Sequence, residues 1–176
     1  MFGRLAGLAG QVQDTAERLA ACLSTGGKLL ICGNGASAAE GQHMAAALSG
    51  RYIKERRPLA AIALSADTSA LTCIGNDFGF EEVFARQVRA LARAGDTLIA
   101  ITAGPGSAAN VLHAVEVARE AGLLTVGLLG DGNERLATAC HVAIVVPGPN
   151  PVRVQAAQQF IAHSLCGLIE TALGFD

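Results

Sequence analysis

Apolar side chains recur at helical spacing near the start of the chain, and mostly polar or small residues fill the positions between them. The apolar positions are Leu5, Leu8, Val12, Leu19 and Leu23. This spacing predicts an amphipathic helix over residues 3–24. The pair Gly26 and Gly27 follows, which is typical of a helix end.

Five short runs of mainly aliphatic residues come next, and helical patterns separate them. Runs with no polar face are typical of strands buried on both sides, as in a parallel sheet covered by helices. The predicted strands are residues 28–32, 59–64, 97–102, 123–129 and 142–146. The predicted helices are an Ala-rich helix after residue 37, a short helix after residue 69, and helices over 81–92, 107–121 and 152–173. The sequence therefore predicts the α/β class, with a five-stranded parallel sheet between two helical layers and an added N-terminal helix.

No internal repeat or low-complexity tract divides the chain, so residues 1–176 are predicted to form one domain. Hydrophobic residues make up 51% of the chain and charged residues 16%, which is rich in apolar surface for a lone domain. The excess predicts burial between the subunits of a homo-oligomer, with the helix over 3–24 in the interface.

Net charge and cysteine spacing argue against several classes of protein, including nucleic-acid-binding, membrane-binding and disulfide-rich proteins. The net charge is -2 and there is no basic run, so neither direct nucleic-acid binding nor a polybasic membrane patch is predicted. The five cysteines are scattered and none forms a C-x-x-C pair, which favours reduced thiols in a cytoplasmic protein. No signal peptide is recognisable, and no apolar run reaches about 18 residues, so no membrane span is predicted.

Two loops follow predicted strands and open predicted helices, where ligands of open parallel sheets bind. The first, Gly33–Ala38, fits the pattern G-x-G-x-x-A, but the acidic residue expected about 20 residues later is missing, since the first acid after the second strand is Asp67. A nucleotide cofactor is therefore disfavoured. A tight turn without a ligand stays an alternative, whereas Asn34 and Ser37 add donors that favour a phosphosugar, and helix N-termini attract phosphate.

The second loop, residues 102–107, allows two interpretations. Ser107 is a natural helix N-cap, and a loop with Gly and Pro is often a simple turn. The same loop is also suited to form a second anion cradle. Further along, Gln155 and His163 are eight residues apart, which puts them on roughly the same side of the last helix, two turns apart.

Segments throughout the chain resemble the phosphoheptose isomerase family of sugar-isomerase (SIS) domains. The matching segments are Gly33–Ser37, Gln42–Ala45, Leu48–Tyr52, Ala61–Leu64, Asp67–Leu71, Ile74–Phe80, Val83–Val88, Gly95–Asp96 and Arg153–Gln155. The match runs in order over nearly the whole chain. A protein that associates with the replication initiator DnaA belongs to the same family.

The resemblance implies a flavodoxin-like fold, a homotetramer with sites at subunit interfaces, and a sugar phosphate as substrate. The family converts sedoheptulose 7-phosphate to glycero-manno-heptose 7-phosphate, a step towards lipopolysaccharide heptose. A proton moves between C1 and C2 through an enediol, so a general base and acid must face the two carbons. Zinc, where it is present, polarises the carbonyl.

The resemblance also assigns roles to individual residues. His43, Gln155 and His163 match three positions of the family's zinc site, and His163 also matches a catalytic acid/base. The positions that match substrate-binding residues are Asn34, Gly35, Ser37, Arg51, Asp77, Thr102, Ser107 and Gln155.

Three departures from the family affect chemistry. The catalytic and metal-binding Glu is replaced by Ala47, whose methyl group neither takes a proton nor binds zinc. Ala103 and Gly104 stand where the phosphate loop is expected to carry hydroxyls, and Pro105 removes a backbone donor. Val152 replaces an Asp.

These losses predict weak isomerase activity or none, because removing a general base costs about 10²- to 10⁴-fold in rate. Glu40, one turn before His43 on the same helix face, is the candidate substitute base. The rival hypothesis is a non-catalytic protein, either a sugar-phosphate sensor or a scaffold that binds a replication initiator.

Overall fold

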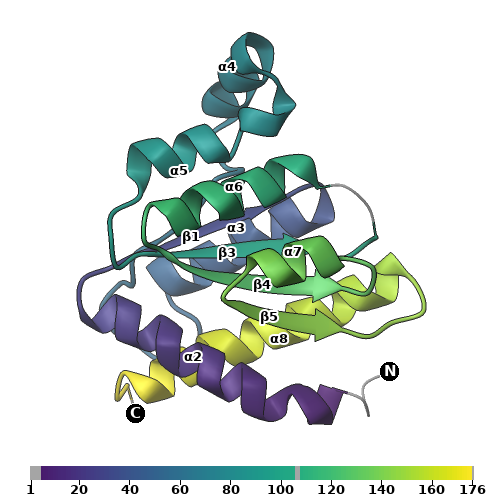
Figure 1. The fold of residues 1–176 in the computed structure, drawn as a ribbon. Helices are drawn as coiled ribbons and strands as arrows, with labels where there is room; N and C mark the ends of the chain where they lie inside the picture. The colour runs from purple at the N-terminus through teal and green to yellow at the C-terminus, as the bar shows by residue number, and fades with distance from the viewer. Residues whose placement is uncertain (1–4, 106–107, 176) are drawn as a thin grey trace.

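The computed structural model describes residues 5–105 and 108–175, and its centre is a parallel sheet of five strands in the order β2-β1-β3-β4-β5 (Figure 1). The strands are β1 (Leu29–Gly33), β2 (Ala61–Ala63), β3 (Thr97–Thr102), β4 (Leu124–Gly130) and β5 (Val142–Val146). This is the flavodoxin-like order, in which the chain reverses direction across the sheet between β1 and β3. The predicted fold class is confirmed.

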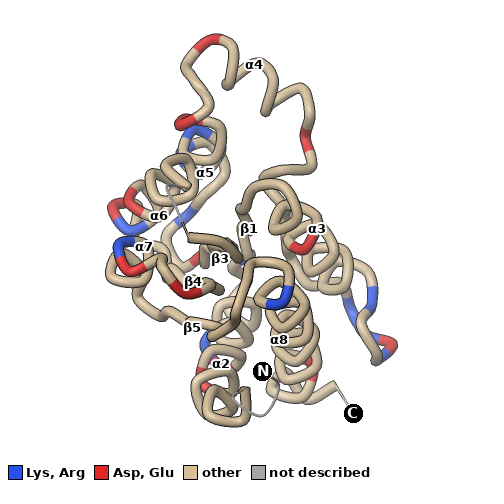
Figure 2. The backbone as a smooth tube through the Cα atoms, turned by 90° about the vertical axis from the view of Figure 1, so that its right-hand side faces the viewer, with Lys and Arg blue, Asp and Glu red and all other residues tan. Residues whose placement is uncertain are grey.

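Helices cover both faces of the sheet. They are η1 (Ala6–Leu8), α2 (Ala9–Ser24), α3 (Ala36–Ser49), α4 (Thr68–Phe78), η2 (Phe80–Glu82), α5 (Ala85–Leu91), α6 (Ala109–Glu120), α7 (Glu134–Ala139) and α8 (Pro151–Ala172). Figure 2 shows α2, α3 and α8 on one side of the sheet and α5, α6 and α7 on the other. The strands are apolar on both faces, so helices must cover both sides of the sheet, which gives three layers.

Alternation along the strands divides the interior into two cores. In β1, Leu29 and Ile31 pack with α2, α3 and α8, whereas Leu30 and Cys32 pack with α5, α6 and α7. Successive strand side chains point to opposite faces, so one strand serves both cores. The apolar face of α2 is also buried within the chain. Its placement in a subunit interface stays a prediction.

Several local features differ from the sequence prediction. The helix predicted over 81–92 is divided into η2 and the shorter α5, and the strand predicted over 59–64 is limited to β2. Helix α7 was not predicted, because six residues are too few to show a helical period. Helix α6 begins at Ala109 with Ala108 in the capping position, two residues later than predicted. Ser107, the predicted N-cap, lies outside the described residues.

Asn150 caps the N-terminus of α8, the helix that carries Gln155 and His163. The Asn150 side chain accepts a hydrogen bond from the backbone N–H of Arg153 at 3.1 Å, and Pro151 occupies the first turn of α8. Both features favour a helix start at this point. The N-terminus of α8 is thereby fixed beside the carboxyl end of the sheet.

Helix α4 projects from the body of the molecule (Figure 1). None of its residues is buried, and Phe78 and the adjoining Phe80 are more than half exposed. Exposed aromatic side chains of this size on a projecting helix are typical of a surface that another chain covers. Across the described ranges, no helix has the length and hydropathy needed to cross a membrane.

Candidate functional site

A cavity of about 380 Å³ lies at the carboxyl ends of β1 and β3, where the first turns of α3 and α8 approach each other. Its lining is Asn34, Ala36, Ser37, Thr102, Ala103, Gly104, Pro105, Ala108, Pro151, Val152 and Gln155. The cavity therefore brings together four predicted substrate-binding residues, namely Asn34, Ser37, Thr102 and Gln155. Two helix N-termini at one cavity favour an anionic ligand.

The loop after β1 is held by a side chain that sequence reasoning missed. Asn34 Nδ2 donates to Asn110 Oδ1 at 2.8 Å, and Asn110 Nδ2 donates to Asn34 Oδ1 at 2.9 Å. The buried Asn110 Oδ1 also accepts the backbone N–H of Val111. This reciprocal amide pair joins the loop after β1 to the first turn of α6, so it sets the spacing of the two predicted anion-binding loops.

Replacing Asn110 with Ala is expected to lower the free energy of unfolding by about 1–3 kcal/mol, because it removes the hydrogen bonds with Asn34 and leaves the backbone N–H of the buried Val111 without this acceptor. Urea denaturation measures the loss. Gln13→Ala is the control, since Gln13 is exposed and bonds only to Glu17 one turn away. Equal stability of Asn110→Ala and the unmodified protein would show that the amide pair is not formed.

The loop after β3 offers few side-chain donors. The Thr102 hydroxyl is 3.5 Å from the carbonyl oxygen of Gly104, a weak contact that leaves it available to a ligand. Ala103, Gly104 and Pro105 contribute no hydroxyl. Asn133 donates a hydrogen bond to the carbonyl oxygen of Gly104 at 3.0 Å, so the backbone of the loop is held without side-chain hydroxyls. Gly35, at the start of α3, takes a φ of 56°, which a residue with a Cβ rarely adopts.

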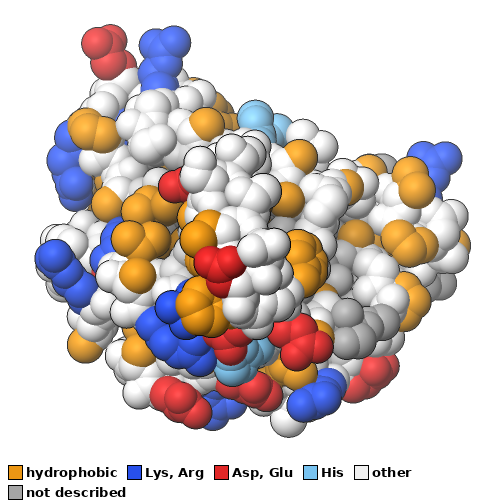
Figure 3. All heavy atoms as spheres, turned by 90° about the horizontal axis from the view of Figure 1, so that it is seen from above, with side chains coloured by type: hydrophobic (Ala, Val, Ile, Leu, Met, Phe, Trp, Pro, Cys, Tyr) orange, Lys and Arg blue, Asp and Glu red, His pale blue; other side chains and the backbone are white. Residues whose placement is uncertain are grey.

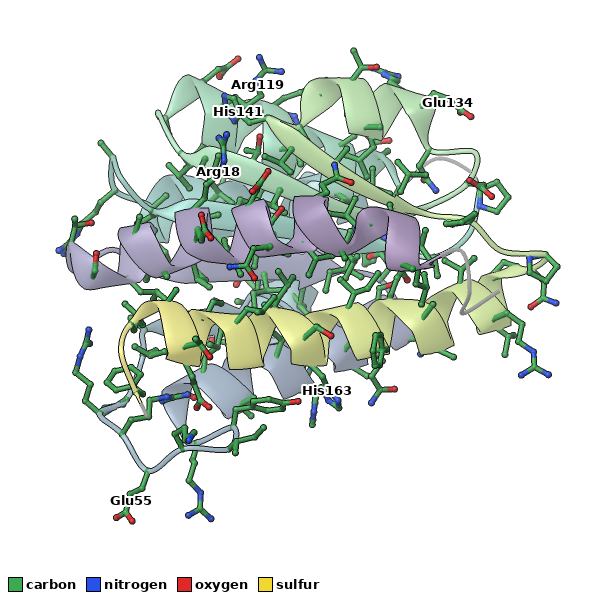
Figure 4. The ribbon with its side chains drawn as sticks, turned by 90° about the horizontal axis from the view of Figure 1, so that it is seen from below. Arg18, Glu55, Arg119, Glu134, His141 and His163 are labelled. Atoms are coloured by element: carbon green, nitrogen blue, oxygen red, sulfur yellow. The ribbon has the colours of Figure 1, made fainter. Side chains whose placement is uncertain are left out.

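Two imidazoles meet on the neighbouring helices α3 and α8. His43 Nε2 and His163 Nε2 are 2.8 Å apart, so one ring donates a hydrogen bond to the other. The Tyr52 ring lies against His163, with 5.6 Å between the ring centroids. Figure 4 shows His163 leaving α8 on the side away from α2. The structure thus brings together two residues that are 120 positions apart in the sequence.

The residues that the resemblance matches to zinc ligands do not complete a metal site among the described residues. Gln155 lines the cavity, but it precedes His163 by two turns, or about 12 Å of helix rise. Ala47 provides no ligand. Zinc in proteins takes at least three side-chain ligands, and across residues 5–105 and 108–175 no group of three His, Cys, Asp or Glu is placed to hold a metal. The donor set therefore does not fit a zinc site within one chain.

Glu40 is the one acidic residue of α3, and its carboxyl group is buried. Neither carboxyl oxygen has a hydrogen-bond partner in the described structure. Burial without compensation raises the pKa of Glu40 to about 7. A carboxyl that exchanges its proton near neutral pH is suited to general acid–base chemistry.

Replacing Glu40 with Gln is expected to stabilise the protein at high pH. Glu40 binds its proton more tightly in the folded state, so the group favours folding at pH 4 and this contribution is lost as the pH rises towards 7. The difference in unfolding free energy between Glu40→Gln and the unmodified protein should grow by about 3 kcal/mol between pH 4.5 and pH 8. Urea melts at the two pH values measure it. A pH-independent difference would mean that Glu40 is solvated or paired.

Arg51 and Asp77 lie apart from the cavity in the single chain. Both are exposed. Asp77 is on the projecting helix α4, where its carboxylate accepts a hydrogen bond from Asn76 at 2.7 Å. Neither residue lines the cavity between β1 and β3.

A larger cavity of about 720 Å³ lies between η2, α6 and α7, on the opposite side of the loop after β3. Four of its lining residues are Glu81, Glu82, Glu116 and Glu134. Figure 3 shows acidic, basic and apolar side chains mixed on the face that is seen from above. Arg135 and His113 also line this cavity, but carboxylates outnumber the cationic groups and disfavour phosphate, so the smaller cavity is the candidate site for a sugar phosphate.

Comparison with known proteins agrees with the fold. The SIS domain family matches residues 4–130. A phosphoheptose isomerase of Rhodospirillum rubrum is 46% identical over 98% of this chain and 91% of its own length. A phosphoheptose isomerase of Campylobacter jejuni is 50% identical over 93% of this chain and 87% of its own length. The solved structure of a phosphoheptose isomerase from Neisseria gonorrhoeae superposes with a TM-score of 0.84 at 43% identity, covering 93% of this chain and 87% of that one.

The match to the SIS domain family, together with the five-stranded parallel sheet, identifies this protein as a SIS domain. Within that class, the chain belongs to the phosphoheptose isomerase family.

Proposed function

We propose that this protein binds a seven-carbon sugar phosphate in the cavity between β1 and β3 and interconverts its ketose and aldose forms slowly. Three features of the described structure support the proposal. They are a cavity at two helix N-termini, an imidazole pair on α3 and α8, and a buried carboxyl on α3 without a partner. The imidazoles and Glu40 do not line the cavity itself, so the proposal requires the sugar to extend from the cavity along α3 and α8. The identity to named isomerases supports sedoheptulose 7-phosphate as the substrate.

The phosphate is proposed to bind at the N-termini of α3 and α8. Ser37, Thr102 and Gln155 line the cavity and offer polar side chains to the phosphate and the sugar hydroxyls. Backbone N–H groups of the first helical turn add the favourable field of the helix end. Because the loop after β3 lacks side-chain hydroxyls at residues 103–105, binding is proposed to be weaker than in a loop rich in Ser and Thr, by roughly 1.5–3 kcal/mol for each hydrogen bond to the charged phosphate.

The isomerisation requires one proton to leave C2 of the aldose or C1 of the ketose and another to arrive at the neighbouring carbon. Glu40 is proposed as the base, since a carboxyl with a pKa of about 7 is ionised in about half the molecules at neutral pH. His163 is proposed to move the proton of the substrate oxygen. The hydrogen bond to His43 holds its ring in one orientation.

A second copy of the chain is proposed to complete the site. Arg51 and Asp77 match substrate-binding positions of the family, and both are exposed and away from the cavity of their own chain. The unburied helix α4, with Phe78 at its end, is suited to pack on another protomer. We therefore propose a homotetramer, in which α4 brings Asp77 towards a neighbouring subunit's cavity.

A cytoplasmic location is proposed from the state of the cysteines. All five are free thiols, and burial raises the pKa of Cys140 and Cys166 to about 12, which keeps them protonated and unreactive. Such thiols suit a reducing compartment.

The test is a discontinuous assay of the purified protein with sedoheptulose 7-phosphate, with and without added zinc. Slow formation of the aldose phosphate supports the proposal. If zinc raises the rate, a metal shared by His43 and His163 with a group from outside the single chain contributes. Absence of any product, under both conditions and at high protein concentration, overturns the catalytic proposal.

A second candidate function, a non-catalytic sugar-phosphate sensor, is favoured by Ala47 and by the loop after β3. In that case calorimetry detects sedoheptulose 7-phosphate binding while the assay detects no turnover. The other non-catalytic hypothesis is a scaffold that binds a replication initiator. A pull-down in which the protein recovers no DnaA would rule out this hypothesis.

A further inference from the structure

A buried carboxylate on α8 organises the segment that follows α3. Glu170 is 2% exposed and lies about two turns after His163. Its Oε2 accepts the backbone N–H groups of Ile53 at 3.3 Å and Lys54 at 3.2 Å. Its Oε1 accepts Arg56 Nε at 3.0 Å. The carboxylate therefore fixes residues 53–56 to the helix that carries His163.

The guanidinium of Arg56 binds the other helix. Its side chain is fully buried. Arg56 Nη2 donates to the carbonyl oxygen of Ala47 at 2.9 Å, and Nη1 donates to that of Leu48 at 2.8 Å. These carbonyls belong to the last turn of α3, where a cation is favoured and the helix leaves acceptors free. Arg56 and Glu170 thus tie the end of α3 to α8.

The tied segment carries Tyr52, whose ring packs on His163. Tyr52 also lies over Gly167, one turn after His163, because a Cβ on that glycine would be 3.5 Å from Tyr52 Cε1. A side chain larger than methyl at position 167 would meet the ring. The position of Tyr52 is therefore set by residues 53–56, which follow it in the chain, and by the surface of α8 at Gly167, where there is no side chain.

We propose that Arg56 and Glu170 are positioning residues that hold Tyr52 against His163 and keep the His43–His163 pair together. They contact neither the cavity nor the imidazoles, and they act through Tyr52 and through the spacing of α3 and α8. A buried ion pair contributes little net stability compared with apolar residues of the same volume, so its main effect is on geometry. The consequence for the rate rests on the proposed function, whereas the geometric claim does not.

The test uses Tyr52 itself, since the chain contains one Tyr and no Trp. Intrinsic tyrosine fluorescence therefore reports on Tyr52 alone. Glu170→Gln replaces one acceptor oxygen with a donor amide, which faces N–H groups and cannot satisfy all three. The double variant Arg56→Met/Glu170→Met keeps an apolar contact and guards against simple loss of folding. Asp96→Asn is the matched control, because the buried Asp96 also forms an ion pair, with Lys28, at the opposite end of β1.

The expected result is that acrylamide quenches Tyr52 more strongly in Glu170→Gln and in the double variant, approaching free tyrosine, while Asp96→Asn keeps the quenching of the unmodified protein. Circular dichroism confirms that each variant is folded. Unchanged quenching in both Glu170 variants overturns the proposal, and so does an equal increase in Asp96→Asn, which would indicate general loosening.

Turnover is measured separately. If the unmodified protein is active, Glu170→Gln should lower kcat by about 10- to 100-fold with little change in KM, as expected for misplaced reacting groups. A rise in KM alone would overturn the positioning role. If the unmodified protein shows no turnover, the proposed function fails while the quenching comparison still decides this inference.

Discussion

Replacing Ala47 with Glu raises kcat for sedoheptulose 7-phosphate by about 10²- to 10⁴-fold, the range that a positioned general base contributes. Ala47 lies on the same face of α3 as His43, one turn later. It is buried, and its carbonyl oxygen is held by Arg56, so the backbone that would carry the new carboxylate is already fixed. A carboxylate at this position supplies the group that the family resemblance implies beside the imidazole pair.

The discontinuous assay with sedoheptulose 7-phosphate measures the effect, and Ala46→Glu is the matched control. Ala46 is the preceding residue, but its side chain is exposed, so the same charge is added to α3 without entering the site. Ala46→Glu is expected to leave kcat unchanged. If Ala47→Glu is as slow as the unmodified protein, the missing carboxylate is not what limits the rate, and the loop after β3 becomes the cause to test.

Replacing Glu40 with Gln removes the activity of the unmodified protein, with an expected fall in kcat of about 10²- to 10⁴-fold. The amide has nearly the same shape as the carboxylic acid but takes no proton. Before substitution, kcat should rise with pH up to about 7 and then level off, because the base acts in its ionised form. The pH–rate profile and the single variant are measured in the same assay.

The Ala47→Glu background separates a catalytic Glu40 from a structural one. With a carboxylate restored at position 47, Glu40→Gln should cost much less, since another base takes the proton. Glu120→Gln, on the exposed surface of α6, is the control in both backgrounds. An equal loss in both backgrounds would contradict the assignment of Glu40 as a substitute base.

Much of the fold is predictable because its signals are local. Strands β3 and β5 have the predicted bounds, since each is an unbroken apolar run between polar or turn residues. The convergence of the loops after β1 and β3 follows from the rule that parallel strands end at the same edge. The meeting of His43 and His163 followed from the family resemblance, because nothing local links residues on two helices so far apart in the chain.

Contacts between distant side chains were not predictable in the same way. The pairing of Asn34 with Asn110, and of Arg56 with Glu170, depends on how α6 and α8 pack on the sheet. An Asn in the first turn of a helix after a binding loop is a weak signal for the first pair. A single acidic residue in the apolar end of α8, Glu170, is a weak signal for the second pair. Arg51 and Asp77 do not line the cavity of their own chain, and no local pattern in the sequence indicates this.

The amide pair between Asn34 and Asn110 has a consequence for the history of this site. The amide pair fixes the start of α6, and Asn133 binds the carbonyl oxygen of Gly104. Neither set of hydrogen bonds uses a side chain of residues 103–105 in the loop after β3. Selection can therefore exchange the chemistry of the loop while the scaffold persists. This decoupling makes the domain evolvable, since a descendant can lose a substrate, gain another or become a receptor, and each change begins from a folded protein.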